Sequence, residues 1–217
     1  RPLRTLVNTH HHGDHTGGNQ VFQGVVKHIV AHSLVPELQR RAAAGAGTEA
    51  DQAYANVTFV ESWRIHLGTE IVSARHYGPG HTGGDIVVHF ENANVVHMGD
   101  LMFNRVHPRI DRPSGASIAN WITTLEQVAD THTADVTFVF GHGKAEFGVV
   151  GESADLLHQR DYFTAVLEHV QACIAAGQSV EEITSIETLP GFDDHGVVVP
   201  RLSLASVLAD AHGELSE

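Results

Sequence analysis

The residues best suited to chemistry lie in one short stretch near the start of the chain, residues 8–19, which reads NTHHHGDHTGGN. It contains the pattern His-x-His-x-Asp-His, formed by His10, His12, Asp14 and His15. Neutral imidazole and carboxylate are the ligands that borderline divalent ions such as zinc prefer. Packing of a hydrophobic core does not explain four such side chains in six residues. The stretch therefore predicts a metal site.

The spacing of these residues indicates two neighbouring positions. An apolar strand, residues 3–7, runs into the motif. On an extended strand end His10 and His12 point to one side, and His11 points to the other. We therefore expect His11 to be dispensable. The glycine after His12 lets the backbone turn sharply, so the last two motif residues reach a second position nearby. A histidine-rich surface loop or a purification tag would lack this Asp-His and the Gly-Gly that follows.

Three further metal-ligand side chains fall where predicted strands end in loops. His81 lies in the stretch GPGHTGGD at residues 78–85, Asp100 ends the apolar strand HMGD, and His142 stands between two glycines. Taken singly, a solvated loop residue is the default interpretation of each. Strand ends at one edge of a sheet converge in space, however, so we expect all three to join the first motif in one site.

The elements that position these residues alternate between strands and helices, without repeats, which predicts α/β layers. Strands are predicted at residues 3–7, 27–31, 57–61, 64–67, 70–77, 85–90, 94–98 and 134–140. Helices are predicted at residues 20–22, 34–41 with Ser33 as N-cap, 117–131, 152–176, 180–186 and 202–215. Residues 42–53, rich in alanine and glycine, are expected to form a mobile loop.

The size and charge of the chain limit its function. A length of 217 residues suits a single domain, residues 1–217, with the ligand motifs in 8–143 and a helical C-terminal part in 150–217. The net charge of −13 disfavours nucleic acid and anionic membranes as partners. The single cysteine, Cys173, excludes an internal disulfide and a cysteine-based zinc knuckle. No membrane-spanning run or leader is visible, which slightly favours the cytoplasm while the compartment stays undetermined.

In their order, these motifs resemble those of the metallo-β-lactamase superfamily. The match comprises His-x-His-x-Asp-His, Gly-His-Thr-x-Gly, Gly-Asp at a strand end and Gly-His, and runs from Leu6 to about Gly143. The resemblance implies an αββα sandwich. In that family several strands precede the first motif, whereas nine residues precede it here. We therefore expect the N-terminal strands to be missing or truncated, with one sheet edge uncovered or completed by another chain.

The resemblance also implies a dinuclear zinc centre, with two Zn²⁺ per chain and Fe or Mn as alternatives. One ion would be held by His10, His12 and His81, and the other by Asp14, His15 and His142, with Asp100 bridging the two. Two divalent ions lower the pKa of a bridging water from 15.7 towards ~7, and the hydroxide then attacks an acyl or phosphoryl centre. Asp14 would orient this nucleophile as well as bind metal.

Residues around the ligands are also assigned expected roles. Partners that fix the ligand histidines are expected among Thr9, Thr82 and Asp85, which are equally well explained as loop-forming residues. His97 is expected to pack or to support the ligands rather than to bind metal. The residues expected to line a substrate cleft are Phe103, Asn104, Arg105 and His107. The loop cations Arg105, Arg109 and Arg112 are expected to be solvated rather than to bind an anion. For Lys144 and Glu146, the sequence does not decide between lining the cleft and lying in a solvated loop.

Aspartate at position 100 separates the branches of the family. Zinc β-lactamases usually carry Cys or Ser there, whereas glyoxalase-II-like thioesterases and lactonases carry Asp. Lactonases often have a tyrosine where Phe103 stands, which disfavours a lactonase. The leading prediction is a hydrolase of a small ester, lactone, thioester or amide. The alternatives are a zinc β-lactamase, a phosphodiesterase or nuclease, an iron-binding redox protein, which His12 disfavours, and a non-catalytic metal-binding derivative. The expected partner is a small-molecule substrate, and a homo-oligomer is left open.

Overall fold

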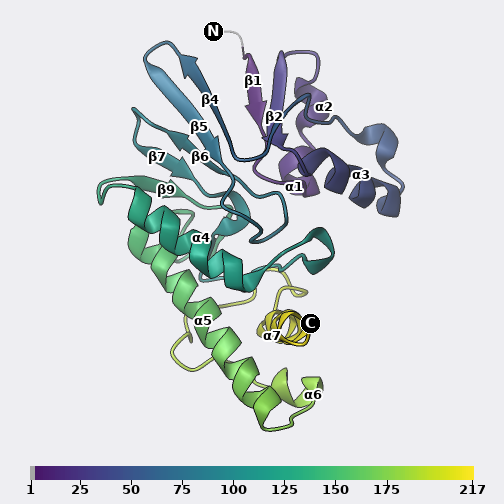
Figure 1. Cartoon of the computed structure of the whole chain (residues 1–217), viewed down its shortest axis with the longest axis vertical. Helices are drawn as coiled ribbons and strands as arrows, with labels where there is room; N and C mark the ends of the chain where they lie inside the picture. The colour runs from purple at the N-terminus through teal and green to yellow at the C-terminus, as the bar shows by residue number, and fades with distance from the viewer. Residues whose placement is uncertain (1–2) are drawn as a thin grey trace.

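Two β-sheets lie face to face at the centre of the molecule (Figure 1). The computed structural model describes residues 3–217; Arg1 and Pro2 lie outside this range. The smaller sheet is parallel, with the order β1 (Thr5–Val7), β2 (His28–His32), β3 (Val57–Phe59). The larger sheet has the order β11 (Val150–Gly151), β9 (Thr137–Val139), β7 (Val95–His97), β6 (Val87–Phe90), β5 (Glu70–Arg75), β4 (Ser62–Leu67). A two-residue parallel pair joins β8 (Phe103–Asn104) to β10 (His142–Gly143).

Helices cover the outer faces of both sheets (Figure 1). Beside the smaller sheet lie α1 (Gly13–Thr16), α2 (Asn19–Phe22), α3 (Val35–Ala46) and the 3₁₀ helix η1 (Glu49–Asp51). Against the larger sheet lie α4 (Ile118–Thr131) and α5 (Ser153–Ala175), followed by α6 (Val180–Ile183) and α7 (Leu204–Leu215). The 3₁₀ helices η2 (Gly99–Leu101) and η3 (Arg112–Ser114) occupy loops. The order of the layers is therefore α, β, β, α, as predicted.

The alternation of side chains along β6 shows how the larger sheet feeds two cores. Val87 packs into the main core with Phe138 and the buried faces of α4, α5 and α7. Its neighbour Val88 points to the other face and packs with Val72 in the smaller core between the sheets. Successive strand residues face opposite sides, so two adjacent valines serve two layers.

The space between the two sheets is incompletely filled. A cavity of about 350 Å³ lies there, lined by residues of both sheets that include Val7, Trp63, Ile65 and Phe90. Within residues 3–217, β1 pairs with β2 alone, so this edge of the smaller sheet is open.

The region from α3 onward differs from the sequence prediction. The predicted N-cap Ser33 is wrong, because α3 begins at Val35 with Leu34 as N-cap and Pro36 in its first turn. The predicted mobile loop at residues 42–53 is also wrong, because α3 continues to Ala46 and η1 follows. Alanine has the highest helix propensity and outweighs Gly45. The helix ends only at Gly47, whose φ of +67° suits a glycine cap.

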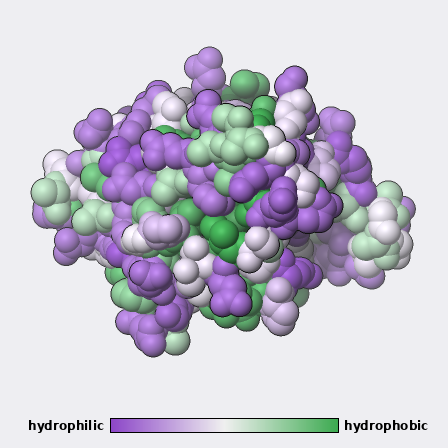
Figure 2. Space-filling model, turned by 90° about the horizontal axis from the view of Figure 1, so that it is seen from below, coloured by the Kyte–Doolittle hydropathy of each residue, from purple (hydrophilic) through white to green (hydrophobic). Residues whose placement is uncertain are grey.

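The remaining predicted elements are present with shifted ends. The hairpin of β6 and β7, the long helix α5 ending before Gly177, and helix α4 within the predicted range 117–131 match the predictions. The very short strands β8, β10 and β11 had not been predicted, because two residues carry no periodicity. No helix in residues 3–217 combines the length and apolarity needed to cross a membrane. The end of the molecule near α6 shows a largely hydrophilic surface with scattered hydrophobic residues (Figure 2).

Helix α5 holds the loop that carries Asp100. Gln159 on this helix is buried, accepts a hydrogen bond from the Phe103 N–H (2.7 Å) and donates one to the Leu101 carbonyl (2.8 Å). The indole N–H of Trp121 on α4 donates to the same carbonyl at 2.9 Å. Two helices therefore fix the backbone directly after Asp100.

We expect Gln159→Leu to lower the free energy of unfolding by about 1–3 kcal/mol, because it leaves a buried N–H without a partner. Urea denaturation of the metal-free chain measures this change. Gln171→Leu, at an exposed position on the same helix, is the matched control and is expected to change stability by less than about 0.5 kcal/mol. Equal effects of the two substitutions would contradict the role given to Gln159.

Candidate metal centre

All seven residues predicted as ligands meet at one place, at the ends of strands. They lie in the turn after β1 (His10, His12), in α1 (Asp14, His15), in the loop after β5 (His81), in η2 after β7 (Asp100) and in β10 (His142). Their ligand atoms form two overlapping groups that share Asp100. Whether each residue binds metal stays a prediction, but the structure brings together every member of the predicted set.

The first group is buried and consists of three imidazoles and one carboxylate. The Nδ1 atom of His12 lies 3.1 Å from Nε2 of His10 and 2.9 Å from Nε2 of His81. The two Nε2 atoms lie 3.8 Å and 3.5 Å from Oδ2 of Asp100. Three ring nitrogens converge on one point, and a cation at that point satisfies all of them.

The second group is more exposed. The Nε2 atom of His15 lies 3.1 Å from Oδ1 of Asp100 and 3.4 Å from Oδ2 of Asp14. The Nε2 atom of His142 lies 3.1 Å from Oδ2 of Asp100 and 3.7 Å from Oδ2 of Asp14. The Asp14 side chain is 61% exposed and that of His142 is 42% exposed, so this group faces solvent. A substrate can therefore approach from this side.

Hydrogen bonds at the outer nitrogens orient the first group. The Nδ1–H of His81 donates to the Arg109 carbonyl at 2.7 Å, and Thr9 Oγ1 lies 3.2 Å from Nδ1 of His10. The Nε2–H of His12 donates to the Asp111 carboxylate at 2.8 Å. These contacts leave Nε2 of His10 and His81 and Nδ1 of His12 as free lone pairs, which is the arrangement that fits a divalent metal.

Of the predicted supporting residues, Thr9 contacts a ligand, whereas Thr82 and Asp85 shape a loop. Asp85 accepts hydrogen bonds from the backbone N–H and the hydroxyl of Thr82, both at 2.7 Å. His97 accepts a hydrogen bond from the Gly99 N–H at 3.0 Å and belongs to neither group, as expected.

Asp111 is the site residue that sequence reasoning missed. It is buried, holds His12, and lies 3.6 Å from Nε2 of His11. His11 belongs to neither group that contains Asp100 and is buried, and burial lowers its pKa to about 4. No spacing rule marks an acid in the loop sequence PRIDRP as a partner of a histidine 99 positions earlier.

The two groups differ in proton affinity. Burial lowers the pKa of His10 well below its usual value and that of His81 to about 3. The hydrogen bond to Asp100 raises the pKa of His142. Burial opposes the charged form of His15, but its hydrogen bond to Asp100 and the charge of that carboxylate raise its pKa. In the absence of metal, His15 and His142 therefore hold protons at a pH where His10 and His81 do not.

The cavity above the metal groups has a volume of about 140 Å³. Of the four residues predicted to line a cleft, Phe103 does so, and its ring stacks on His142 at 5.0 Å between ring centroids. The other three side chains form contacts outside the cavity. Asn104 donates hydrogen bonds to the Phe147 and Gly148 carbonyls. Arg105 forms ion pairs with Asp155 and Asp194, and His107 forms a hydrogen bond with the Tyr162 hydroxyl.

The loop cations also differ from the expectation of a solvated loop. Arg105 forms ion pairs with the carboxylates of Asp155 and Asp194. Arg112 donates a hydrogen bond to the Asp210 carbonyl and forms an ion pair with Glu217. Of these three loop cations, Arg109 alone lines the cavity above the ligand groups. Lys144 pairs with Glu146 at 3.1 Å, so these two residues are accounted for as a surface ion pair.

Comparison with known proteins agrees with the fold and the motifs. The family model of the metallo-β-lactamase superfamily matches residues 1–143, and the chain belongs to this superfamily. A hydroxyacylglutathione hydrolase of Maricaulis maris is 30% identical over 170 residues, which is 78% of this chain and 60% of that protein. The chain spans 30% to 60% of the length of the curated relatives it matches.

Two solved structures show the same fold. The inverting sec-alkylsulfatase Pisa1 of a Pseudomonas species aligns with a TM-score of 0.75 and 16% identity, over 98% of this chain and 41% of that one. A metallo-β-lactamase of Pontibacter korlensis aligns with a TM-score of 0.58 and 22% identity, over 76% and 70% of the two chains. At these identities the two structures support a shared fold.

We expect Asp111→Asn to weaken zinc binding about 10- to 100-fold, because the loss of a carboxylate partner frees the ring of His12. Competition with a chromophoric chelator measures the affinity. Asp130→Asn, at an exposed position on α4, serves as the control. An unchanged affinity in Asp111→Asn would show that His12 is oriented by other means.

For the predicted centre of two ions, we expect acid to remove the ions in sequence. Binding requires neutral imidazoles, so protonation competes with it. The hydrogen bonds and charge of Asp100 raise the pKa values of His15 and His142, whereas burial lowers that of His81 to about 3. As pH falls from 7 to about 5.5, the metal content should decrease from about two to about one per chain. Simultaneous loss of both metals would contradict this order.

Proposed function

We propose that the chain is a dinuclear zinc-dependent hydrolase that cleaves a small ester, thioester, lactone or amide. The observation that supports this most is the position of Asp100. Its Oδ1 lies 3.1 Å from Nε2 of His15, and its Oδ2 lies 3.1 Å from Nε2 of His142 in the same group. The same Oδ2 lies within 3.8 Å of two histidines of the first group, His10 and His81. One carboxylate between two ligand groups is the arrangement that a pair of divalent ions requires. The likeness to a hydroxyacylglutathione hydrolase supports the thioester as one candidate bond.

When bound, two zinc ions would acidify a water molecule and polarise the carbonyl of the scissile bond. The residues of the chain then perform distinct tasks. His10, His12 and His81 form a rigid, buried set of ligands at the bottom of the site, because hydrogen bonds fix their outer nitrogens. Asp14, exposed at the cavity, orients the attacking water and accepts its proton. Phe103, packed on His142, keeps the cavity wall apolar and restricts solvent on that side.

A β-lactam amide is the alternative substrate within the family. The metallo-β-lactamase of Pontibacter korlensis has the same fold as this chain, but a sequence identity of 22% supports a shared fold and not a shared substrate. The acid at position 100, rather than Cys or Ser, favours the acyl hydrolases, so we place the ester and thioester first.

The experiment is turnover by the zinc-loaded chain of 4-nitrophenyl esters, thioesters, lactones and the β-lactam nitrocefin. We expect hydrolysis of at least one ester or thioester, its loss on chelation and its return on addition of zinc. Asp14→Asn should lower kcat at least about 100-fold, because the water loses its proton acceptor. Asp130→Asn, exposed and distant, is the control.

Two results would overturn the proposal. One is a folded, zinc-loaded chain that turns over no acyl substrate. The other is hydrolysis that survives removal of the metal. Turnover of nitrocefin alone would transfer the assignment to the β-lactam amide.

A further inference from the structure

Two arginines, Arg109 and Arg201, line the cavity above the metal-ligand groups. Both also line a second cavity, of about 690 Å³, which shares His12 and Asp14 with the first. Arg41 of α3 lines this second cavity as well. The mouth of the metal centre is therefore bordered by guanidinium groups that come from three separate segments of the chain.

Arg109 and Arg201 lack the close carboxylate partners that Arg105 and Arg112 have. Arg105 and Arg112 are held by carboxylates within 3.2 Å. Arg109 is 45% exposed and lies 3.5 Å from Asp111, whose carboxylate already accepts the hydrogen bond from His12. For Arg201, no carboxylate oxygen of residues 3–217 lies within 4.0 Å. In a chain of net charge −13, these two cations lie together at the entrance of the ligand cluster.

The rest of the wall is apolar. Beside Phe103, the cavity above the metal groups is lined by Val106, Val198, Val199 and Leu202. Val198 and Val199 belong to the same C-terminal segment as Arg201 and are themselves more than a third exposed. A ligand that fills this space therefore meets apolar side chains and guanidinium groups together.

We propose that Arg109 and Arg201 form a subsite for an oxyanion at the end of the substrate remote from the scissile bond, so that the substrates are acyl compounds with an apolar chain ending in a carboxylate or sulfonate. Guanidinium groups bind such oxyanions through paired N–H donors, and their strength rises where apolar walls exclude water. This inference rests on the proposed hydrolase function, which supplies the reaction, and adds the class of substrate.

The test compares two esters of matched chain length, 4-nitrophenyl hydrogen suberate and 4-nitrophenyl octanoate, which differ by the terminal carboxylate. With the zinc-loaded chain we expect kcat/KM to be about 10- to 100-fold higher for the anionic ester, the effect of one charge-assisted hydrogen-bond pair. Arg201→Ala and Arg109→Ala should lower this preference towards one. Arg201→Lys should retain part of it, because lysine keeps the charge but lacks the planar fork.

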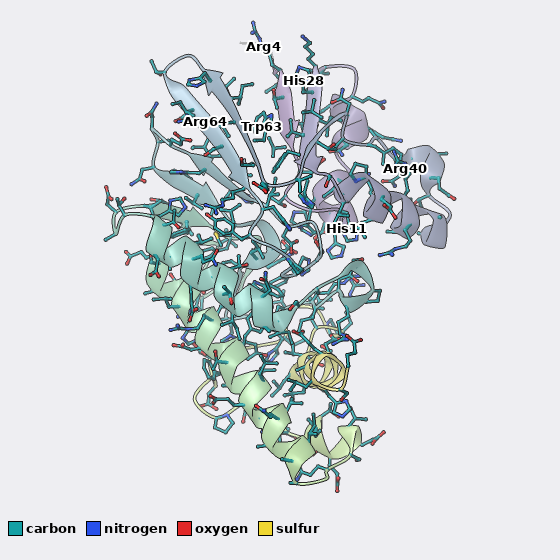
Figure 3. The ribbon with its side chains drawn as sticks, in the orientation of Figure 1. Arg4, His11, His28, Arg40, Trp63 and Arg64 are labelled. Carbon is teal, nitrogen blue, oxygen red and sulfur yellow. The ribbon has the colours of Figure 1, made fainter. Side chains whose placement is uncertain are left out.

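Arg40→Ala is the matched control. Arg40 lies on the outer side of α3, away from His11, with its guanidinium 4.6 Å from the centre of the Tyr54 ring, and it lines neither cavity (Figure 3). It should leave the preference unchanged. Replacing the carboxylate by a sulfonate in the anionic ester distinguishes a general oxyanion site from one that accepts carboxylate alone.

A binding measurement separates this inference from the proposed function. Suberic acid monoanilide and octananilide replace the ester by an amide of low reactivity, and calorimetry gives their affinities for the zinc-loaded chain. We expect the anionic anilide to bind about 10-fold or more tightly than the neutral one, and Arg201→Ala to remove the difference. Equal binding and equal turnover of the charged and neutral members would overturn the subsite. Tight binding of the anionic anilide without turnover of either ester would support the subsite while the hydrolase proposal fails.

Discussion

The burial of the Asp100 carboxylate among histidines constrains the whole structure. Burial opposes its ionisation, but hydrogen bonds from His142 and His15 hold its pKa below the usual range. A buried carboxylate costs several kcal/mol unless cations compensate it. Burial lowers the pKa values of His10 and His81, so these two imidazoles favour the neutral state and do not supply that charge, whereas two divalent ions would. The backbone around Asp100 allows little adjustment, because a side chain at Gly141 would overlap with its carboxylate.

The stiffness needed for such a site comes from one half of the molecule. On the side of α4 and α5, Trp121 and Gln159 hold the loop after Asp100 within a continuous core. On the opposite side, the sheets enclose an unfilled apolar space, and β1, which leads into the first motif, is an edge strand in the described residues. The ligands on the C-terminal strands are thus held more firmly than those that follow β1. Metal binding should therefore contribute to the stability of the N-terminal half in particular.

Much of this arrangement could be predicted from the sequence, because metal chemistry restricts residue types so strongly. His10, His12, Asp14 and His15 stand in one motif, and glycines mark the loops of His81 and His142. The alternation of strands and helices was sufficient to predict the layers. Asp111 could not be found, because its contact with His12 joins segments far apart in sequence. The position of Arg105 could not be predicted either, because its ion-pair partners Asp155 and Asp194 are also distant in the sequence and hold it away from the cleft.

The most direct test of the central claim is a crystal structure of the zinc-loaded chain with anomalous scattering at the zinc edge. We expect two peaks about 3.5–4 Å apart, with Asp100 between them and His12 bound to the first ion through Nδ1. A single peak among His11, His12 and Asp111, which also form a compact group of ligand atoms, would contradict it. So would two ions that do not share Asp100.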